Sequence, residues 1–69
     1  MAEPTAAAHR RYRYRFARPG NVELSTGEYE SDEAAEAAAR RVSSDQQTPV
    51  IVERHDLVDW EYVTEVDER

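Results

Sequence analysis

The stretch RRYRYRF, residues 10–16, combines residue types that bind polynucleotides: guanidinium groups pair with phosphates, and aromatic rings stack on bases. Aromatic and arginine residues alternate strictly in it, which is the period of a β-strand with two different faces. Base stacking and phosphate contact need one shared surface, whereas this alternation separates the rings from the charges. We therefore expect the rings to lie in the core and the opposite face to carry Arg11, Arg13 and Arg15.

The charge distribution also argues against a nucleic-acid partner. Residues 1–20 carry five arginines against one acid, or +4, and residues 21–69 carry four arginines against fourteen acids, or −10, which sums to the net charge of −6. Affinity for nucleic acid comes from neutralising phosphate charge. Binding through the arginine face of residues 10–18 is therefore only an alternative. A charge-compensated strand kept soluble by its arginines, or contact with an acidic protein patch, explains the same face.

Few residues suit acid–base or metal chemistry, since the chain has two histidines and no cysteine. His55 stands close to Asp56 and Asp59, which would orient an imidazole or form a weak metal site. The spacing matches no ligand pattern, and a polar hairpin tip explains it equally well. We expect no enzymatic activity, no cofactor and no small-molecule substrate, and keep a weak metal or catalytic site at residues 55–59 as a second alternative.

Acidic residues gather where the second predicted strand leads into a helix: Glu28, Glu30, Asp32, Glu33 and Glu36. Acids in the first turn stabilise a helix through its dipole. They would also repel the phosphate that a helix N-terminus otherwise attracts. We interpret the cluster as a solvated helix face, with docking of a basic partner as the alternative.

Two hairpins and a helix are predicted to position these residues. A turn at residues 18–21 joins strands over 11–16 and 22–30, and an odd-length loop would place Phe16 opposite Val22 and Tyr14 opposite Leu24, with a bulge near Gly27. Ser31 caps a helix over residues 34–42, and a loop follows over 43–49.

A third strand begins at Val50, and a fourth covers residues 60–66 with Trp60, Tyr62, Thr64 and Val66 in phase. The order ββαββ predicts an α+β domain, a four-stranded sheet with one helix packed on one face. Short connections favour a sheet in which the first and last strands are central and parallel to each other. This element order resembles that of β-grasp domains. An all-antiparallel sheet is the alternative. The predicted core from the strands is Tyr14, Phe16, Val22, Leu24, Val52, Trp60 and Tyr62.

We expect residues 10–66 to form a single domain between a flexible tail at 1–9 and a short C-terminal tail at 67–69. No segment reaches the about 20 apolar residues of a membrane span, and the N-terminus lacks the apolar run of a signal peptide. A cytoplasmic protein without a membrane partner is the expectation.

Apolar residues are predicted on both faces of the second hairpin, although one helix can cover only one face. Ile51 and Val63 fall opposite their neighbours in the core, and Leu57 and Val58 stand near the tip. Such a patch often marks an interface, although scattered exposed apolar residues are also normal. A chain of 69 residues without disulfides buries only about 60% of its unfolded surface. The sequence therefore predicts a non-enzymatic protein-interaction or self-associating module.

Overall fold

The computed structural model describes residues 11–55 and 59–69, so the predicted tail at 1–9 and the predicted surface residues Leu57 and Val58 lie outside the described part. Four strands and one helix follow the predicted order and confirm the α+β, ββαββ fold. They are β1 (Tyr12–Arg18), β2 (Val22–Tyr29), α2 (Asp32–Gln46), β3 (Val50–His55) and β4 (Trp60–Val66).

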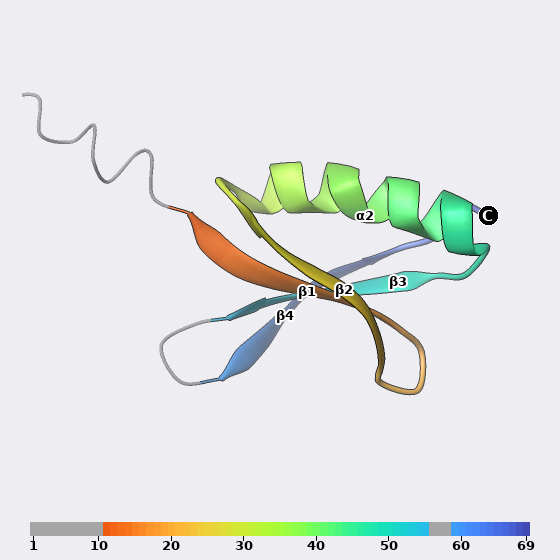
Figure 1. The fold of residues 1–69 in the computed structure, drawn as a ribbon, viewed down its shortest axis with the longest axis horizontal. Helices are drawn as coiled ribbons and strands as arrows, with labels where there is room; N and C mark the ends of the chain where they lie inside the picture. The colour runs from red at the N-terminus through yellow and green to blue at the C-terminus, as the bar shows by residue number, and fades with distance from the viewer. Residues whose placement is uncertain (1–10, 56–58) are drawn as a thin grey trace, which may run out of the picture.

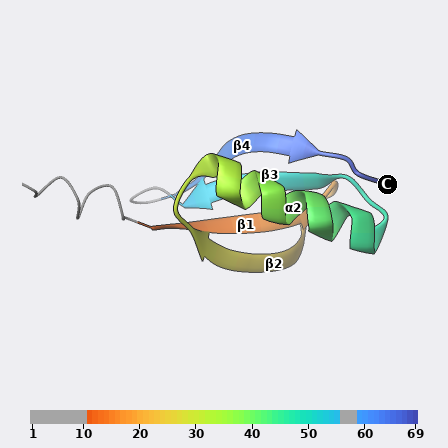
Figure 2. The same ribbon diagram turned by 90° about the horizontal axis from the view of Figure 1, so that it is seen from above.

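The four strands form one sheet in the order β2-β1-β3-β4, and each strand is antiparallel to its neighbours. The helix α2 lies across one face of this sheet (Figures 1 and 2). The favoured arrangement with parallel first and last strands in the centre is therefore wrong, and the all-antiparallel alternative is correct. β3 takes the central place because Val50 and Val52 are fully buried, whereas β4 carries the exposed Tyr62 and suits an edge.

The first hairpin turns through residues 19–21, where Gly20 (φ 95°) and Asn21 (φ 63°) both adopt positive φ values. The loop is odd in length, as predicted, but Arg18 rather than Phe16 faces Val22. A bulge then leaves Leu24 without a partner in the register, so that Phe16 faces Ser25 and Tyr14 faces Gly27. The predicted pairs were wrong because the loop contains three residues, 19–21, where the predicted register needs five, and because the bulge at Leu24 then shifts the register by one more residue.

This bulge allows both Leu24 and Tyr29 to pack against the core. The Tyr29 ring lies over Gly27, where an added Cβ would come within 3.1 Å of Tyr29 Cε2. Its centroid is 5.8 Å from those of Tyr14 and Phe16. A glycine at this place leaves room for the ring that closes the core at the β2 edge, a role that the sequence did not reveal.

The second hairpin also contains a bulge. Val52 pairs with Thr64, whereas Glu53 pairs with Tyr62, so Val63 is an extra residue in β4. The bulge separates the four residues of β4 that were predicted to share one face of the sheet, Trp60, Tyr62, Thr64 and Val66. Thr64 and Val66 lie on the face that α2 covers, and Trp60 and Tyr62 lie on the other face.

The core between α2 and the sheet is formed by buried residues of β1, α2, β3 and the end of β4: Tyr14, Phe16, Ala35, Ala39, Val50, Val52 and Val66. The predicted core positions Tyr14, Phe16 and Val52 are confirmed. Val22 and Tyr62 are exposed by 42% and 66%, so their prediction was wrong. Tyr62 is exposed because the bulge at Val63 changes the phase of β4, whereas Val22 pairs with Arg18 at the exposed end of the first hairpin.

The helix begins at the predicted N-cap, where Ser31 accepts a hydrogen bond from the Ala34 amide at 3.1 Å. It continues past the predicted end to Gln46, and Gln47 closes it in the left-handed conformation with φ 56°. In the described part of the chain, no helix is long and apolar enough to cross a membrane.

The longer helix brings Ser43, predicted to lie in a loop, into a fully buried position. Its hydroxyl donates to the Thr48 carbonyl at 2.6 Å and accepts from the Glu68 amide at 2.8 Å. One side chain thus connects α2 to the segment before β3 and to the segment after β4.

Replacing Ser43 by alanine leaves both of these partly buried backbone groups without their partner. We expect Ser43→Ala to lower the free energy of unfolding by about 1–3 kcal/mol, measured by urea denaturation. Ser44→Ala is the matched control, because Ser44 is exposed and uses only its backbone carbonyl, which accepts from Gln47. Equal stabilities of the two variants would contradict the role given to Ser43.

Candidate interaction surface on the helix-free face

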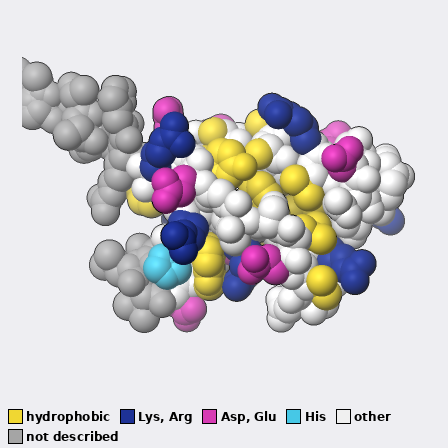
Figure 3. Space-filling model, in the orientation of Figure 1, with side chains coloured by type: hydrophobic (Ala, Val, Ile, Leu, Met, Phe, Trp, Pro, Cys, Tyr) yellow, Lys and Arg dark blue, Asp and Glu magenta, His cyan; other side chains and the backbone are white. Residues whose placement is uncertain are grey.

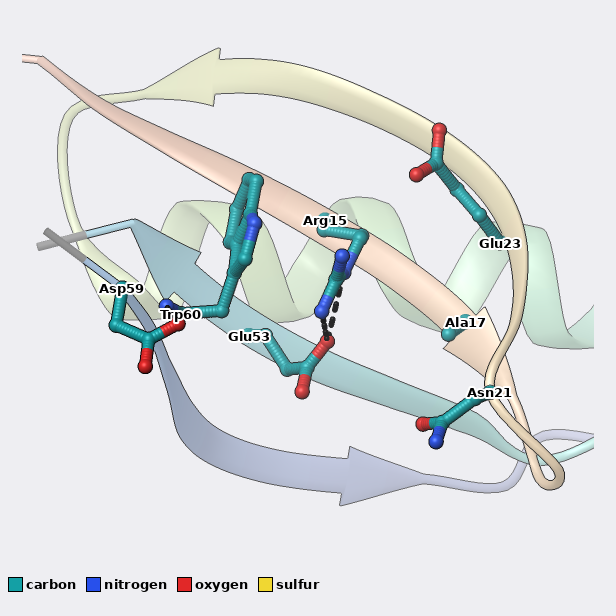
Figure 4. Close-up of a pocket in the computed structure, with 7 residues that line it drawn as sticks. All are labelled: Arg15, Ala17, Asn21, Glu23, Glu53, Asp59 and Trp60. Atoms are coloured by element: carbon teal, nitrogen blue, oxygen red, sulfur yellow. Dashed lines mark hydrogen bonds and ion pairs between the residues drawn. The ribbon is translucent and has the colours of Figure 1, made fainter.

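The face of the sheet opposite α2 is formed by alternate residues of the four strands, and we call it the helix-free face. Residues that are paired across neighbouring strands lie on the same face of the sheet, so the registers and the two bulges show which residues belong to it. They are Arg13, Arg15, Ala17, Glu23, Thr26, Glu28, Ile51, Glu53, His55, Trp60, Tyr62 and Glu65. Figure 4 views this face, with α2 behind the sheet.

The centre of the helix-free face is a contact between an arginine and the tryptophan. The guanidinium carbon of Arg15 lies 4.6 Å from the centroid of the Trp60 ring. Arg15 and Glu53 are paired across β1 and β3, and the Arg15 Nε and Nη2 atoms both lie 2.8 Å from Glu53 Oε1 (Figure 4). Arg15 is therefore held by a ring and by a carboxylate, which fixes a long side chain in one position.

Trp60 also contacts the last residue of β3. The His55 and Trp60 rings meet edge to face with centroids 5.1 Å apart. We call Arg15, Glu53, His55 and Trp60 the Arg–Trp cluster. Two residues further along β4, Tyr62 is 66% exposed, more than any other large hydrophobic residue in the described part of the chain.

A hollow of about 510 Å³ lies between the two hairpin ends and the cluster. It is lined by Arg15, Ala17, Asn21, Glu23, Glu53, Asp59 and Trp60. Its walls carry three acids and one arginine, and the arginine is already paired, whereas small-molecule sites are lined mainly by apolar groups. The hollow is therefore better suited to receive a polar side chain of a docked surface than a free ligand.

The three arginines predicted to share a face behave differently. Arg15 belongs to the Arg–Trp cluster. Arg13 is exposed on the same face and forms no ion pair with any residue in the described ranges. Arg11 precedes β1, and its guanidinium contacts the Glu28 carbonyl at 3.4 Å and the Glu30 carboxylate at 3.8 Å.

Of the apolar residues predicted for the surface, Ile51 is half-buried on the helix-free face. Val63 instead packs against the core, so its assignment to the uncovered face was wrong. The β4 bulge gives the reason, since it turns Val63 toward the helix side and leaves Trp60 and Tyr62 on the other side.

From the sequence, we expected the aromatic rings and the arginines to lie on opposite faces of the sheet. Tyr14 and Phe16 are buried, as the alternation in β1 predicted. Trp60 and Tyr62 nevertheless bring rings to the Arg15 face from β4, so aromatic and guanidinium groups do share a surface. One sequence feature indicated this arrangement: Val63 and Val66 are three residues apart and cannot lie on the same face of a regular strand, so a bulge is needed for both to reach the core.

A second polar cluster, on the side of the sheet that faces α2, joins the helix N-terminus to three strands. The Tyr14 hydroxyl donates to Asp32 Oδ1 at 2.6 Å, and Arg54 Nη1 donates to the two Asp32 oxygens at 2.9 and 3.0 Å. Arg54 Nη2 lies 3.1 Å from Glu61. Burial, followed by the hydrogen bond to Asp32, raises the pKa of Tyr14 from 10.0 to about 12.

Glu61 and Asp32 raise the pKa of Arg54 against the opposing effect of burial. At neutral pH the phenol is protonated and the guanidinium is charged; Asp32 accepts hydrogen bonds from both groups, and Glu61 accepts one from Arg54. We therefore assign this cluster a structural role, which also accounts for Asp32 in the acidic group at the helix start.

Another member of that acidic group is engaged further along the helix. Arg40 pairs with Glu36 one turn earlier and with Glu68 at 2.6 Å, and these carboxylates raise the pKa of Arg40, Glu68 having the larger effect. Within residues 11–55 and 59–69, no three histidine, cysteine or acidic side chains are placed to hold a metal ion. Asp56, part of the alternative metal site, lies outside these ranges.

No protein-family model matches this chain, and no curated protein or solved structure shows a significant similarity to it.

Because the pKa of Tyr14 is raised in the folded chain, the free energy of unfolding depends on pH in the alkaline range. The folded state holds the phenolic proton more tightly than the unfolded state, so this contribution is fully present below pH 10 and is lost as pH rises toward 12. We expect the free energy of unfolding to fall by roughly 2 kcal/mol over this interval, and Tyr14→Phe to remove that part of the fall. Urea denaturation at each pH measures it, with Tyr62→Phe as the exposed control; an unchanged slope in Tyr14→Phe would contradict the assignment.

The Arg–Trp cluster can be followed with the single tryptophan of the chain. We expect Arg15→Met to change the emission of Trp60 and to cost roughly 1 kcal/mol, because the cation–π contact and the half-buried ion pair with Glu53 are both lost. Arg13→Met is the matched control from the same strand and face. Indistinguishable emission spectra of the two variants would show that Arg15 does not stack on Trp60.

Proposed function

We propose that the chain is a non-enzymatic protein-interaction module that binds its partner through the helix-free face. The observation that supports this most is the exposure of Tyr62, 66%, beside Trp60 and Ile51 on a face that α2 leaves uncovered. Aromatic residues and arginine are enriched at the centres of protein interfaces, where they contribute most of the binding energy. A rigid Arg–Trp cluster adjoining an exposed tyrosine has this composition.

The charges of the face favour a protein over a polynucleotide. Two arginines on it stand against four glutamates, Glu23, Glu28, Glu53 and Glu65. Figure 3 shows a similar mixture on the side of the molecule that it views, where basic and acidic groups are interspersed with hydrophobic ones. Phosphate binding needs a net positive field, whereas protein interfaces use complementary charges of both signs.

The edges of the sheet are less suited to association than its face. Both edge strands, β2 and β4, carry a bulge and acidic side chains, which are features that prevent strand pairing. In an antiparallel pairing of two β4 strands centred on Val63, Glu61 would face Glu65 of the other copy, and like charges in that position are destabilising. The helix-free face is the remaining large surface of the sheet.

Single-stranded nucleic acid is a second candidate, supported by the one observation that Arg15, Trp60 and Tyr62 share a face. Sheets that bind single strands use aromatic rings as stacking platforms next to basic groups. The excess of acid on the face argues against it, and the same experiment distinguishes the two partner classes.

Photo-crosslinking from one position tests the proposal. p-Benzoylphenylalanine in place of Tyr62 should give a discrete protein adduct on irradiation in the native cell, whereas the same residue in place of the exposed Arg41 on α2 should not. The adduct should disappear when Ile51→Arg is added, since a charge would then interrupt the face.

Two results would contradict the proposal. A nuclease-sensitive adduct at position 62 would indicate the polynucleotide partner instead. Identical products from positions 62 and 41 would show that the helix-free face has no special role.

A further inference from the structure

The helix-free face carries more acidic than basic side chains, and this excess indicates the chemistry of its partner. We infer that the face binds a basic segment of the partner protein, whose arginine side chains enter the hollow beside the Arg–Trp cluster. This inference rests on the proposed function, because it uses the same face and names the kind of segment that occupies it.

The hollow has two carboxylates that are free to pair. Among the charged residues that line it, Arg15 and Glu53 neutralise each other, since Arg15 Nη2 lies 2.8 Å from Glu53 Oε1. Glu23 and Asp59 are both exposed, and neither forms an ion pair with another residue in the described part of the chain. The hollow thus keeps two negative charges that cations from outside can neutralise.

The two free carboxylates stand on opposite sides of the Arg15–Glu53 pair (Figure 4). Asp59 precedes Trp60, the first residue of β4, and its Oδ1 atom accepts a hydrogen bond from the Trp60 amide at 2.9 Å. Glu23 is the second residue of β2, next to the turn of the first hairpin. Because the ion pair lies between them, one cation cannot contact both carboxylates. The ligand must carry cations at more than one position, as a basic segment of a chain does.

The rest of the face adds to the acidic excess. Glu65 on β4 is exposed, lies next to Ile51 of β3 and forms no ion pair within residues 11–55 and 59–69. The remaining arginine of the face, Arg13, has Glu28 as its neighbour across β2, which offsets its charge. Because the neighbouring strands bring more acids than β1 brings arginines, the face attracts a basic partner rather than the acidic patch that the arginines of β1 alone would suit.

The same excess of acid disfavours two other occupants of the face. A polynucleotide would bring phosphates against unpaired carboxylates. A second copy of this chain, whose net charge is −6, would set one acidic face against another. A basic protein segment avoids both repulsions, and the overall charge of the chain also draws it in.

The aromatic residues of β4 favour arginine over lysine in such a segment. Trp60 and Tyr62 follow Asp59 along this face. A guanidinium group stacks on a ring and donates to a carboxylate at the same time, whereas an ammonium group is a compact charge that is more strongly hydrated. Arg15 already makes this double contact within the chain, with Trp60 and Glu53.

Neutralisation of the two free carboxylates tests the inference. The probe is a synthetic peptide of alternating arginine and glycine, and the emission of Trp60, the single tryptophan of the chain, reports its binding at low salt. We expect the double variant Glu23→Gln, Asp59→Asn to bind this peptide about fivefold more weakly, because two exposed ion pairs are lost. Both substitutions keep the shape of the side chain, and an asparagine still accepts the hydrogen bond from the Trp60 amide.

The matched control is the double variant Glu33→Gln, Asp45→Asn, which changes the net charge equally at two exposed positions of α2. It should leave the affinity for the peptide unchanged. A peptide with lysine in place of arginine should bind more weakly, and one with glutamate should not bind. Far-ultraviolet circular dichroism verifies that both double variants are folded.

Three outcomes would overturn the inference. They are unchanged Trp60 emission up to millimolar peptide, equal affinities of the two double variants, and equally strong competition by spermine, which would show that the hollow takes any small polycation. A lysine peptide that binds as tightly as the arginine peptide would contradict the preference for arginine.

The crosslinker at position 62 separates these failures from failure of the proposed function. In the native cell, the adduct should be lost when Glu23→Gln and Asp59→Asn are added. An adduct that persists in this background would refute the basic segment and leave the proposed function intact. A chain that gives no adduct at position 62 even with both carboxylates present would contradict the proposed function itself.

Discussion

The contact between the alanine side of α2 and one face of the sheet is the constraint on which the other features depend. Ala35 and Ala39 are fully buried against rings and branched side chains of the central strands. Because alanine is small, the helix backbone approaches the sheet closely, and Tyr14 and Phe16 provide most of the volume between them. A single helix covers a single face, so the opposite face must be stabilised by its own side chains or by a partner.

The two bulges decide which side chains belong to which face. The bulge at Leu24 lets Tyr29 close the core over Gly27, and the bulge at Val63 turns Trp60 onto the helix-free face. Without the second bulge, Trp60 would share the phase of Val66 and point toward the helix. A local irregularity of one residue in β4 thus produces the Arg–Trp cluster and the surface that we propose as the interface.

Local patterns in the sequence predicted the element order, the N-cap at Ser31 and the burial of the β1 rings, because each depends on residues close together in the chain. The strand order and both registers depend on contacts between distant segments, and no local pattern encodes them. The end of the helix was placed too early because Ser43 favours loops by composition, while in the structure its buried hydroxyl satisfies two distant backbone groups. In the candidate site, Arg15 and Ile51 lie on the helix-free face as expected, but its central ring, Trp60, was assigned to the core.

The most direct test of the account is the position of the Trp60 indole relative to the two faces of the sheet. In a nuclear Overhauser spectrum of the folded chain, we expect contacts from the indole protons to the side chains of Arg15 and His55, consistent with distances of 4.6 and 5.1 Å to the ring centroid. Contacts from the indole to the methyl groups of Ala35 or Ala39 would instead place Trp60 beneath the helix. That result would remove the bulge, the cluster and the helix-free interface together.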